Sequence, residues 1–195
     1  MTRDEDFIEI ILSRRSIRQF KQERIPKADL KRCLDTARLA PSASNLQPIE
    51  YFLVDDELKI NEIFPLLKWA GYITPDGDPK KGNEPTAYLF ILVNRSIRED
   101  GAEYDVGAAA ENFMLSAWSI GIGSCWLISV DRQRVREILK IPEGYVIDSV
   151  VALGYPDEQP VIESTKDDIR YWKDDADNLH VPKRDLADIL HLNKW

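Results

Sequence analysis

An uninterrupted apolar run, Tyr88-Leu-Phe-Ile-Leu-Val93, constrains the fold of this chain more than any other feature. A run of this length, rich in aromatic and branched side chains, predicts a strand that is buried in a core. The preceding residues, 68–86, contain three glycines and three prolines and form the longest stretch of breakers in the chain. We therefore expect a long irregular excursion that leads into a buried strand, and excursions of this length are often functional.

Helical and strand patterns alternate along the rest of the chain. Apolar residues at helical spacing predict helices over residues 7–15, 27–40, 104–120 and 131–140, the last with Asp131 as its N-terminal cap. Further strands are predicted over residues 50–54, 124–130 and 146–153. The tail, residues 158–195, is charged and is predicted to be irregular until a last helix that contains Leu186, Ile189 and Leu190.

Length and composition indicate one folded domain over residues 1–195. The chain has 195 residues, against about 150 for a typical domain. Apolar residues make up 44% and charged residues 31%, which is typical of a folded globular protein and excludes disorder. No repeat or linker divides the sequence.

The acidic balance limits the partners of this protein. Asp and Glu number 34 against 26 Lys and Arg, a net charge of −8, which repels nucleic-acid backbones and anionic lipids. No stretch approaches 18 apolar residues and the first residues lack the pattern of a signal peptide. The two cysteines, Cys33 and Cys125, are too few for a disulfide scaffold, and we expect Cys33 in the core. These features predict a cytoplasmic protein that binds neither nucleic acid nor membranes.

Spacing argues against several familiar sites. The histidines, His180 and His191, are eleven positions apart in the tail, which suits neither a metal pair nor a catalytic dyad. Gly77 and Gly82 have the spacing of a phosphate loop, but the Lys and Ser or Thr that must follow are missing. We therefore expect no metal site and no catalytic side chain.

A basic cluster stands out against the acidic chain. Arg14, Arg15 and Arg18 lie within five residues, beside the Ser16 hydroxyl, and forked guanidinium donors suit a phosphate group. The alternative is a solvated run of charge. A second basic pair, Lys183-Arg184, could add phosphate donors or could simply begin a helix.

A polar loop between two prolines is the second candidate site. Its hydroxyl and amide side chains both donate and accept hydrogen bonds, which suits a heterocycle edge of mixed polarity. These side chains are Ser42, Ser44, Asn45 and Gln47. The alternative is turn chemistry alone, because the same residue types favour turns.

Five segments, in this order, resemble the signatures of the FMN-dependent nitroreductase family. They are Arg14-Arg15-Ser16-Ile-Arg18-Gln-Phe20, Ala40-Pro41-Ser42-Ala-Ser44-Asn45-Leu-Gln47-Pro48, Tyr104-Asp-Val-Gly107-Ala-Ala-Ala-Glu-Asn112, Ile120-Gly-Ile-Gly123-Ser-Cys-Trp126 and Gly154-Tyr-Pro156. No single segment is diagnostic, but the ordered set is specific. The resemblance runs from about residue 7 to the end of the chain.

The resemblance implies a fold, a cofactor and an assembly. The fold would be of the α+β class, with a mostly antiparallel central sheet between helices, and two copies would form an intertwined homodimer with FMN at the interface. Arg14, Arg15, Ser16 and Arg18 would hold the phosphate and ribityl chain, completed by Lys183 and Arg184. Ser42, Ser44, Asn45 and Gln47 would contact the flavin, partly from the second subunit. The backbone of Trp126, Leu127 and Ile128 would lie against the isoalloxazine ring, with an N–H near the flavin N5.

The resemblance also implies the chemistry. A family member takes hydride from NAD(P)H at the flavin and passes it to a nitroaromatic or quinone-like acceptor in a ping-pong cycle, so the missing catalytic side chains are explained. Two alternatives remain open: a flavin-binding module or redox sensor without turnover, and a family member with other flavin chemistry, such as dehalogenation or substrate oxidation. Residues 68–86, with Trp69 and Tyr72, would cover the flavin face, unless those aromatic side chains pack inward.

Overall fold

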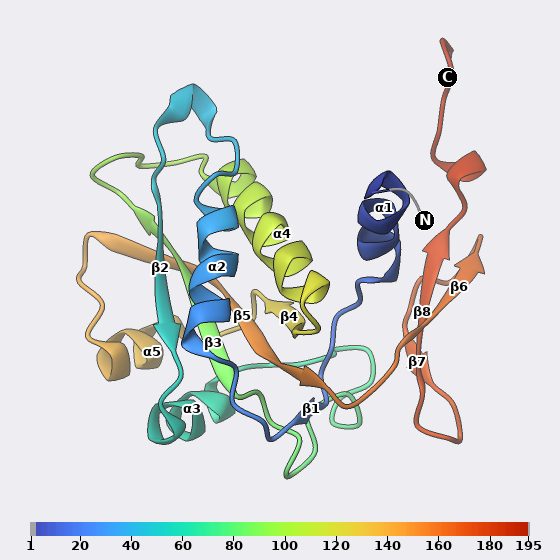
Figure 1. The fold of residues 1–195 in the computed structure, drawn as a ribbon, viewed down its shortest axis with the longest axis horizontal. Helices are drawn as coiled ribbons and strands as arrows, with labels where there is room; N and C mark the ends of the chain where they lie inside the picture. Colours follow the sequence, from blue (N-terminus) through green and yellow to red (C-terminus); the bar gives the residue numbers. More distant parts are fainter. Residues whose placement is uncertain (1–2, 195) are drawn as a thin grey trace.

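The predicted apolar run is the central strand of the protein. A computed structural model describes residues 3–194, in which β3 (Ala87–Asn94) is buried along almost its whole length (Figure 1). Strands β2 (Ile49–Val54) and β5 (Tyr145–Pro156) pair with it in antiparallel register on either side. The buried strand expected from the sequence is confirmed.

The long strand β5 holds the rest of the sheet together. It pairs with β3 along one edge and with β4 (Gly123–Leu127) along the other, and its last two residues pair with β1 (Phe20–Lys21). The order is β1-β5-β3-β2, with β4 beside β5, and every pair in this sheet is antiparallel. The expected α+β class with a mostly antiparallel central sheet is confirmed.

Both faces of the sheet are covered, because successive side chains of β3 point to opposite faces. Tyr88 and Phe90 belong to the core on one face, and Leu89 and Ile91 to the core on the other. Four helices supply the opposing side chains: α3 (Glu57–Ile63) and α5 (Arg132–Leu139) on the first face, and α2 (Lys27–Ala37) and α4 (Glu103–Ser119) on the second. The sheet is therefore the middle layer of three.

Local hydrogen bonds define where the helices begin. The Asp131 carboxylate accepts from the backbone N–H of Arg134 at 3.1 Å, so the predicted cap of α5 is confirmed. Asp56 caps α3 in the same way, but the sequence patterns did not predict this seven-residue helix. The first helix, α1, spans Arg3–Ser13. Within residues 3–194, none of the helices has the length and apolarity needed to cross a bilayer.

The tail differs from the expectation of an irregular segment with a last helix. It forms a second sheet in the order β6-β8-β7 from β6 (Val161–Thr165), β7 (Trp172–Lys173) and β8 (Leu179–Arg184), which lies beside the main body (Figure 1). The expected helix is only a short 3-10 turn, Leu186–Asp188. Leu186, Ile189 and Leu190 are exposed, and an isolated apolar stripe without a packing surface does not stabilise a helix.

Two glycines let the chain between α1 and β1 press onto the sheet. A Cβ at position 154 would lie 2.7 Å from a ring carbon of Phe20. A Cβ at position 123 would lie 2.9 Å from the Ile17 side chain. Both Ile17 and Phe20 are fully buried, so these contacts fix the residues around the arginine cluster.

We predict that Gly154→Ala lowers the free energy of unfolding by about 2 kcal/mol, because Phe20 must move away from the added methyl group. Urea denaturation followed by circular dichroism measures this loss. Gly144→Ala is the matched control, since no atom lies within 4 Å of its ideal Cβ. Equal losses in the two variants would contradict the assigned role of the close contact.

Candidate functional site

The arginine cluster lies in the connection between α1 and β1, alongside β4. The backbone N–H of Ile17 donates to the carbonyl of Ser124 at 2.9 Å, and Ser16 and Ser124 form an isolated parallel bridge. Because Ile17 is buried, the neighbouring side chains of Arg14, Arg15, Ser16 and Arg18 are held half-buried at the edge of the sheet. This is not the freely solvated run of charge considered as the alternative.

The three arginines have different partners. The Nε of Arg14 lies 3.5 Å from a carboxylate oxygen of Glu111 on α4. The Arg15 guanidinium donates to the carbonyls of Leu12, at 2.6 Å, and of Arg14, near the end of α1. Burial and the neighbouring charge of Arg14 lower the pKa of Arg15. The Nε of Arg18 is buried without a hydrogen-bond acceptor among the described residues. Arg14 and Arg18 are thus the arginines with donors to offer a ligand.

The polar loop has a strained backbone. Ser44, Asn45 and Gln47 have φ angles of 53°, 55° and 53°, in the left-handed region that side chains disfavour. Within the loop, the Ser42 hydroxyl accepts from the backbone N–H of Gln47 at 2.9 Å. Strained residues persist only where the surroundings fix them, and they cluster at functional sites. Turn preferences explain the left-handed angle at Asn45 but not those at Ser44 and Gln47.

A buried carboxylate on α4 fixes this loop. Asp105 is 3% exposed and accepts from the Ser42 hydroxyl at 2.6 Å and from the Ala43 N–H at 3.2 Å. Arg98 lies 3.6 Å from the same carboxylate. Asp105 lies in the first turn of α4, where a negative charge is favoured because the N-terminal end of a helix is positive. Asp105 therefore acts as the anchor of the loop.

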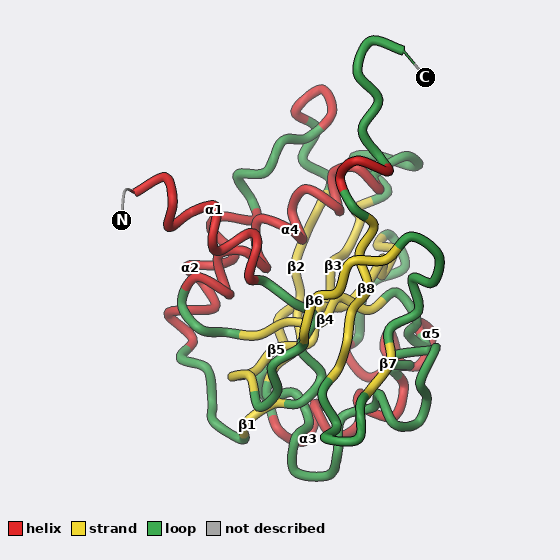
Figure 2. The backbone as a smooth tube through the Cα atoms, turned by 90° about the vertical axis from the view of Figure 1, so that its right-hand side faces the viewer, coloured by secondary structure: helices red, strands yellow, loops and turns green. Residues whose placement is uncertain are grey.

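Helix α4 separates the loop from the arginine segment. Asp105 and Glu111 are six residues apart, so they lie about 9 Å apart along the helix axis and point about 120° apart around it. The polar loop and the arginine segment are consequently attached to different sides of α4, as Figure 1 shows for the backbone. Figure 2 shows α1, which leads into the arginine segment, beside α4. Within one chain the structure does not bring them together.

The remaining candidates lie at the end of β4 and on the tail. Strand β4 stops pairing with β5 at Leu127, which is buried, and the side chain of Ile128 is exposed. The indole N–H of Trp126 donates to the Ser149 hydroxyl at 2.7 Å, which fixes that ring within the protein. Lys183 and Arg184 are exposed at the end of β8, where Arg184 donates to the carbonyl of Asp188.

The tail sheet that carries this basic pair is fastened by His180. Its Nδ1 lies 2.6 Å from Glu163 and its Nε2 lies 3.3 Å from Asp174, and the ring stacks on Trp172 with centroids 4.2 Å apart. Burial lowers the pKa of His180, but the hydrogen bonds to the two carboxylates outweigh burial and raise the pKa above its ordinary value. His180 thus has a structural role in the tail.

The excursion over residues 68–86 begins next to the end of β4. Leu67 bridges Val130, and the N–H of Lys68 donates to the carbonyl of Ser129 at 3.0 Å. Trp69 is only 5% exposed and packs in the core, so the inward alternative holds for this ring. Tyr72 is 58% exposed, and only this one of the two aromatic side chains remains available to cover a ligand.

Sequence reasoning assigned no role to Asp105 or Glu111. Both stand in the segment Tyr104 to Asn112, where they are the acidic residues of an otherwise largely apolar pattern. Acidic residues in an apolar helical segment could have indicated a role, since a carboxylate on a largely buried helix needs a polar partner. The structure shows those partners to be the loop and the arginine segment.

Comparison with known proteins identifies the family of this chain. The family model described as "Nitroreductase family" matches residues 11–155, well over half of the chain. The chain belongs to the nitroreductase family. The matched residues include Arg14 to Arg18, the polar loop, α4 and β4, and they end at β5. The tail sheet with Lys183 and Arg184 lies outside the match.

Individual nitroreductase relatives resemble nearly the whole chain. A protein of Archaeoglobus fulgidus, provisionally named NADH dehydrogenase/NAD(P)H nitroreductase, is 33% identical, with 98% of this chain and 99% of the relative covered. The NADPH-flavin oxidoreductase of Vibrio harveyi is 26% identical over 80% of this chain and 68% of its own. The solved structure of an FMN-dependent nitroreductase from Clostridium difficile R20291 is 26% identical and superposes with a TM-score of 0.70, covering 96% of this chain and 99% of that one.

We predict that Asp105→Asn lowers the free energy of unfolding by about 2 kcal/mol and speeds amide hydrogen exchange in residues 42–47, because the loop loses its charged acceptor. Glu103→Gln removes a carboxylate from the same helical turn and is the matched control, since Glu103 is exposed. Unchanged exchange in the Asp105 variant would show that the loop is held by other contacts.

Proposed function

We propose that this nitroreductase-family protein is an FMN-dependent oxidoreductase that transfers hydride from NAD(P)H to a nitroaromatic or quinone-like acceptor in a ping-pong cycle. FMN, when bound, supplies the chemistry, because flavin N5 accepts and donates hydride. The names of the relatives in Archaeoglobus fulgidus, Vibrio harveyi and Clostridium difficile support the cofactor and the nicotinamide donor. Both cysteines are buried free thiols, in keeping with our placing of this activity in the cytoplasm.

The arginine segment is the observation that carries this proposal. The buried Nε of Arg18 has no acceptor within the described residues, and an unpaired buried donor is costly unless a ligand satisfies it. Arg14 adds a second guanidinium whose only ion pair, among the described side chains of residues 6–194, is the 3.5 Å contact to Glu111. An anionic group with several acceptor oxygens, such as the FMN phosphate, fits this donor set. We assign Ser16, Lys183 and Arg184 to the same phosphate site, together with Arg15, which contributes mainly its charge because two of its donors face backbone carbonyls.

A homodimer would complete the site. Because the loop and the arginine segment are attached to different sides of α4, we propose that the loop residues Ser42, Ser44, Asn45 and Gln47 reach the flavin bound by the other subunit. Exposed apolar side chains support such an association, since patches of this kind commonly mark interfaces. On α1 these are Phe7, Ile8, Ile11 and Leu12, and on the tail they are Leu186, Ile189, Leu190 and Leu192.

The protein would bind and orient the flavin rather than react itself. Trp126 and Leu127 form the last pairs of β4 with β5, and Ile128 follows them; we propose that the backbone of these three residues lies against the flavin ring with an N–H near N5. Burial raises the pKa of the Cys125 thiol, so this cysteine is a poor nucleophile. These assignments leave the redox chemistry to the cofactor and give the side chains binding roles.

An anaerobic titration tests the proposed function. Protein reconstituted with FMN should stay yellow after desalting, lose its visible absorption on addition of NADH or NADPH, and regain it with a nitroaromatic or quinone acceptor. A colourless protein after desalting would refute flavin binding. A yellow protein that neither nicotinamide bleaches would refute the oxidoreductase and support a flavin module without turnover.

We predict that Arg14→Ala raises the Kd for FMN by about 10- to 100-fold, because a charge-assisted hydrogen bond to the phosphate is lost. Quenching of flavin fluorescence measures the Kd. Arg15→Ala should have a smaller effect, since the Arg15 donors are already used by backbone carbonyls. Arg24→Ala is the control, because Arg24 is exposed and its ion pair is with Glu57. Equal affinity in the Arg14 variant and the wild type would contradict the phosphate assignment.

A further inference from the structure

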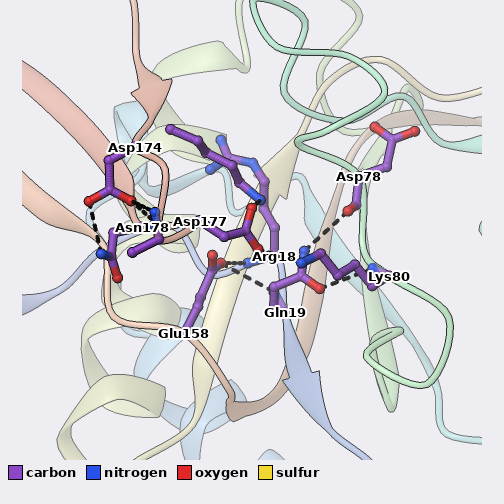
Figure 3. Close-up of polar contacts among 10 residues, drawn as sticks. Arg18, Gln19, Asp78, Lys80, Glu158, Asp174, Asp177 and Asn178 are labelled. Atoms are coloured by element: carbon purple, nitrogen blue, oxygen red, sulfur yellow. Dashed lines mark hydrogen bonds and ion pairs between the residues drawn. The ribbon is translucent and has the colours of Figure 1, made fainter.

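Three segments that are distant in sequence meet at Gln19, immediately after the arginine cluster. Its amide nitrogen donates to the carbonyl of Asp78 at 3.1 Å, and its amide oxygen accepts from the N–H of Lys80 at 3.0 Å (Figure 3). The excursion is therefore fixed to the arginine segment through one buried side chain. From the other side, Glu158 accepts from the backbone N–H groups of Arg18 and Gln19, the latter at 3.1 Å.

The tail is fixed to the same place. Lys80 of the excursion forms an ion pair with Asp177, which also binds Lys173 at 2.8 Å (Figure 3). The turn that contains Asp177 is closed by Asp174, which accepts from the backbone N–H of Asn178 at 2.8 Å. The excursion and the tail thus hold each other beside Arg18.

Tyr171 of the tail contacts both other segments. The guanidinium carbon of Arg18 lies 5.4 Å from the centroid of the Tyr171 ring, within the range of a cation–π interaction. The rings of Tyr171 and Tyr72 have centroids 4.9 Å apart, and the Tyr72 N–H donates to the Tyr171 hydroxyl at 3.4 Å. Tyr171 therefore contacts both Arg18 and the exposed ring of the excursion.

We propose that Tyr171 is a positioning residue that aims Arg18 at the cofactor phosphate. This inference rests on the proposed function. A guanidinium group stacks through its flat face and donates hydrogen bonds from its edge. The contact with the Tyr171 ring needs no hydrogen-bond acceptor, and the buried Nε of Arg18 has none among the described residues, so an anion can still supply one. Tyr171 lies beyond residues 11–155, so this contribution comes from outside the part matched by the family model.

The contact with Tyr171 also restricts the Arg18 side chain, which Glu158 does not. Glu158 fixes the backbone at Arg18, but a long side chain on a fixed backbone still samples several rotamers. The aromatic ring restricts those rotamers without using a donor. Loss of the ring should therefore weaken the binding of a ligand that carries a phosphate and spare the same ligand without it.

A graded series at position 171 tests this role without changing the shape of the side chain. Tyr171→Phe keeps the ring, and replacement by mono-, di- and trifluorinated phenylalanine weakens the negative face of the ring stepwise. The Kd of each protein is measured for FMN and for riboflavin, which lacks the phosphate. We expect Tyr171→Phe to bind FMN within about 2-fold of the wild type, and the Kd for FMN to rise roughly 3- to 10-fold along the series while that for riboflavin stays constant.

The controls separate positioning from a general effect on the tail. The same fluorinated residues at Trp172, which stacks on His180 rather than on Arg18, should change neither Kd. In an Arg18→Met background the series at position 171 should have no effect on FMN binding. A flat Kd for FMN along the series, or a parallel rise for riboflavin, would overturn the role of Tyr171 while leaving the proposed function intact. A wild-type protein that binds riboflavin as tightly as FMN would instead refute the phosphate site itself.

Discussion

The packing of Ile17 and Phe20 against Gly123 and Gly154 is the contact on which the candidate site depends. Without side chains at the two glycines, the chain after α1 lies directly on β4 and β5. That placement brings Arg14 to the carboxylate on α4 and Arg18 to the tail. The position of the charged groups is therefore set by apolar packing in the layer beneath them.

Regular elements with a strong local signal could be predicted from the sequence. The apolar run of β3 and the cap of α5 are visible in a few consecutive residues, and both are confirmed. Helix α3 is too short to show a clear helical period of apolar residues, and its N-terminal cap, Asp56, was not a sufficient signal alone. The prediction for the tail was wrong. Leu186, Ile189 and Leu190 have helical spacing, which suggested a helix, and the strands β6 and β8 were missed because they pair residues nearly twenty positions apart. Spacing reports local geometry and says little about such distant pairing.

The same limit explains what was missed in the candidate site. The arginines and the polar loop were identified by their own side-chain chemistry. The contacts of Asp105 and Glu111, and the role that we propose for Tyr171, involve residues far away along the chain, and only the fold reveals these contacts. The division between the two sides of α4 likewise follows from helix geometry, which gives the proposed second subunit a structural reason beyond the resemblance.

The left-handed residues of the polar loop have a thermodynamic consequence. Each such residue costs of order 1 kcal/mol or more in the folded chain, and the buried Asp105 carboxylate offsets this cost when the protein folds. The loop consequently holds its shape before anything binds to it. A ligand that meets Ser44, Asn45 and Gln47 encounters a rigid surface, so little conformational entropy is lost on association, and selectivity there depends on shape rather than on adaptation.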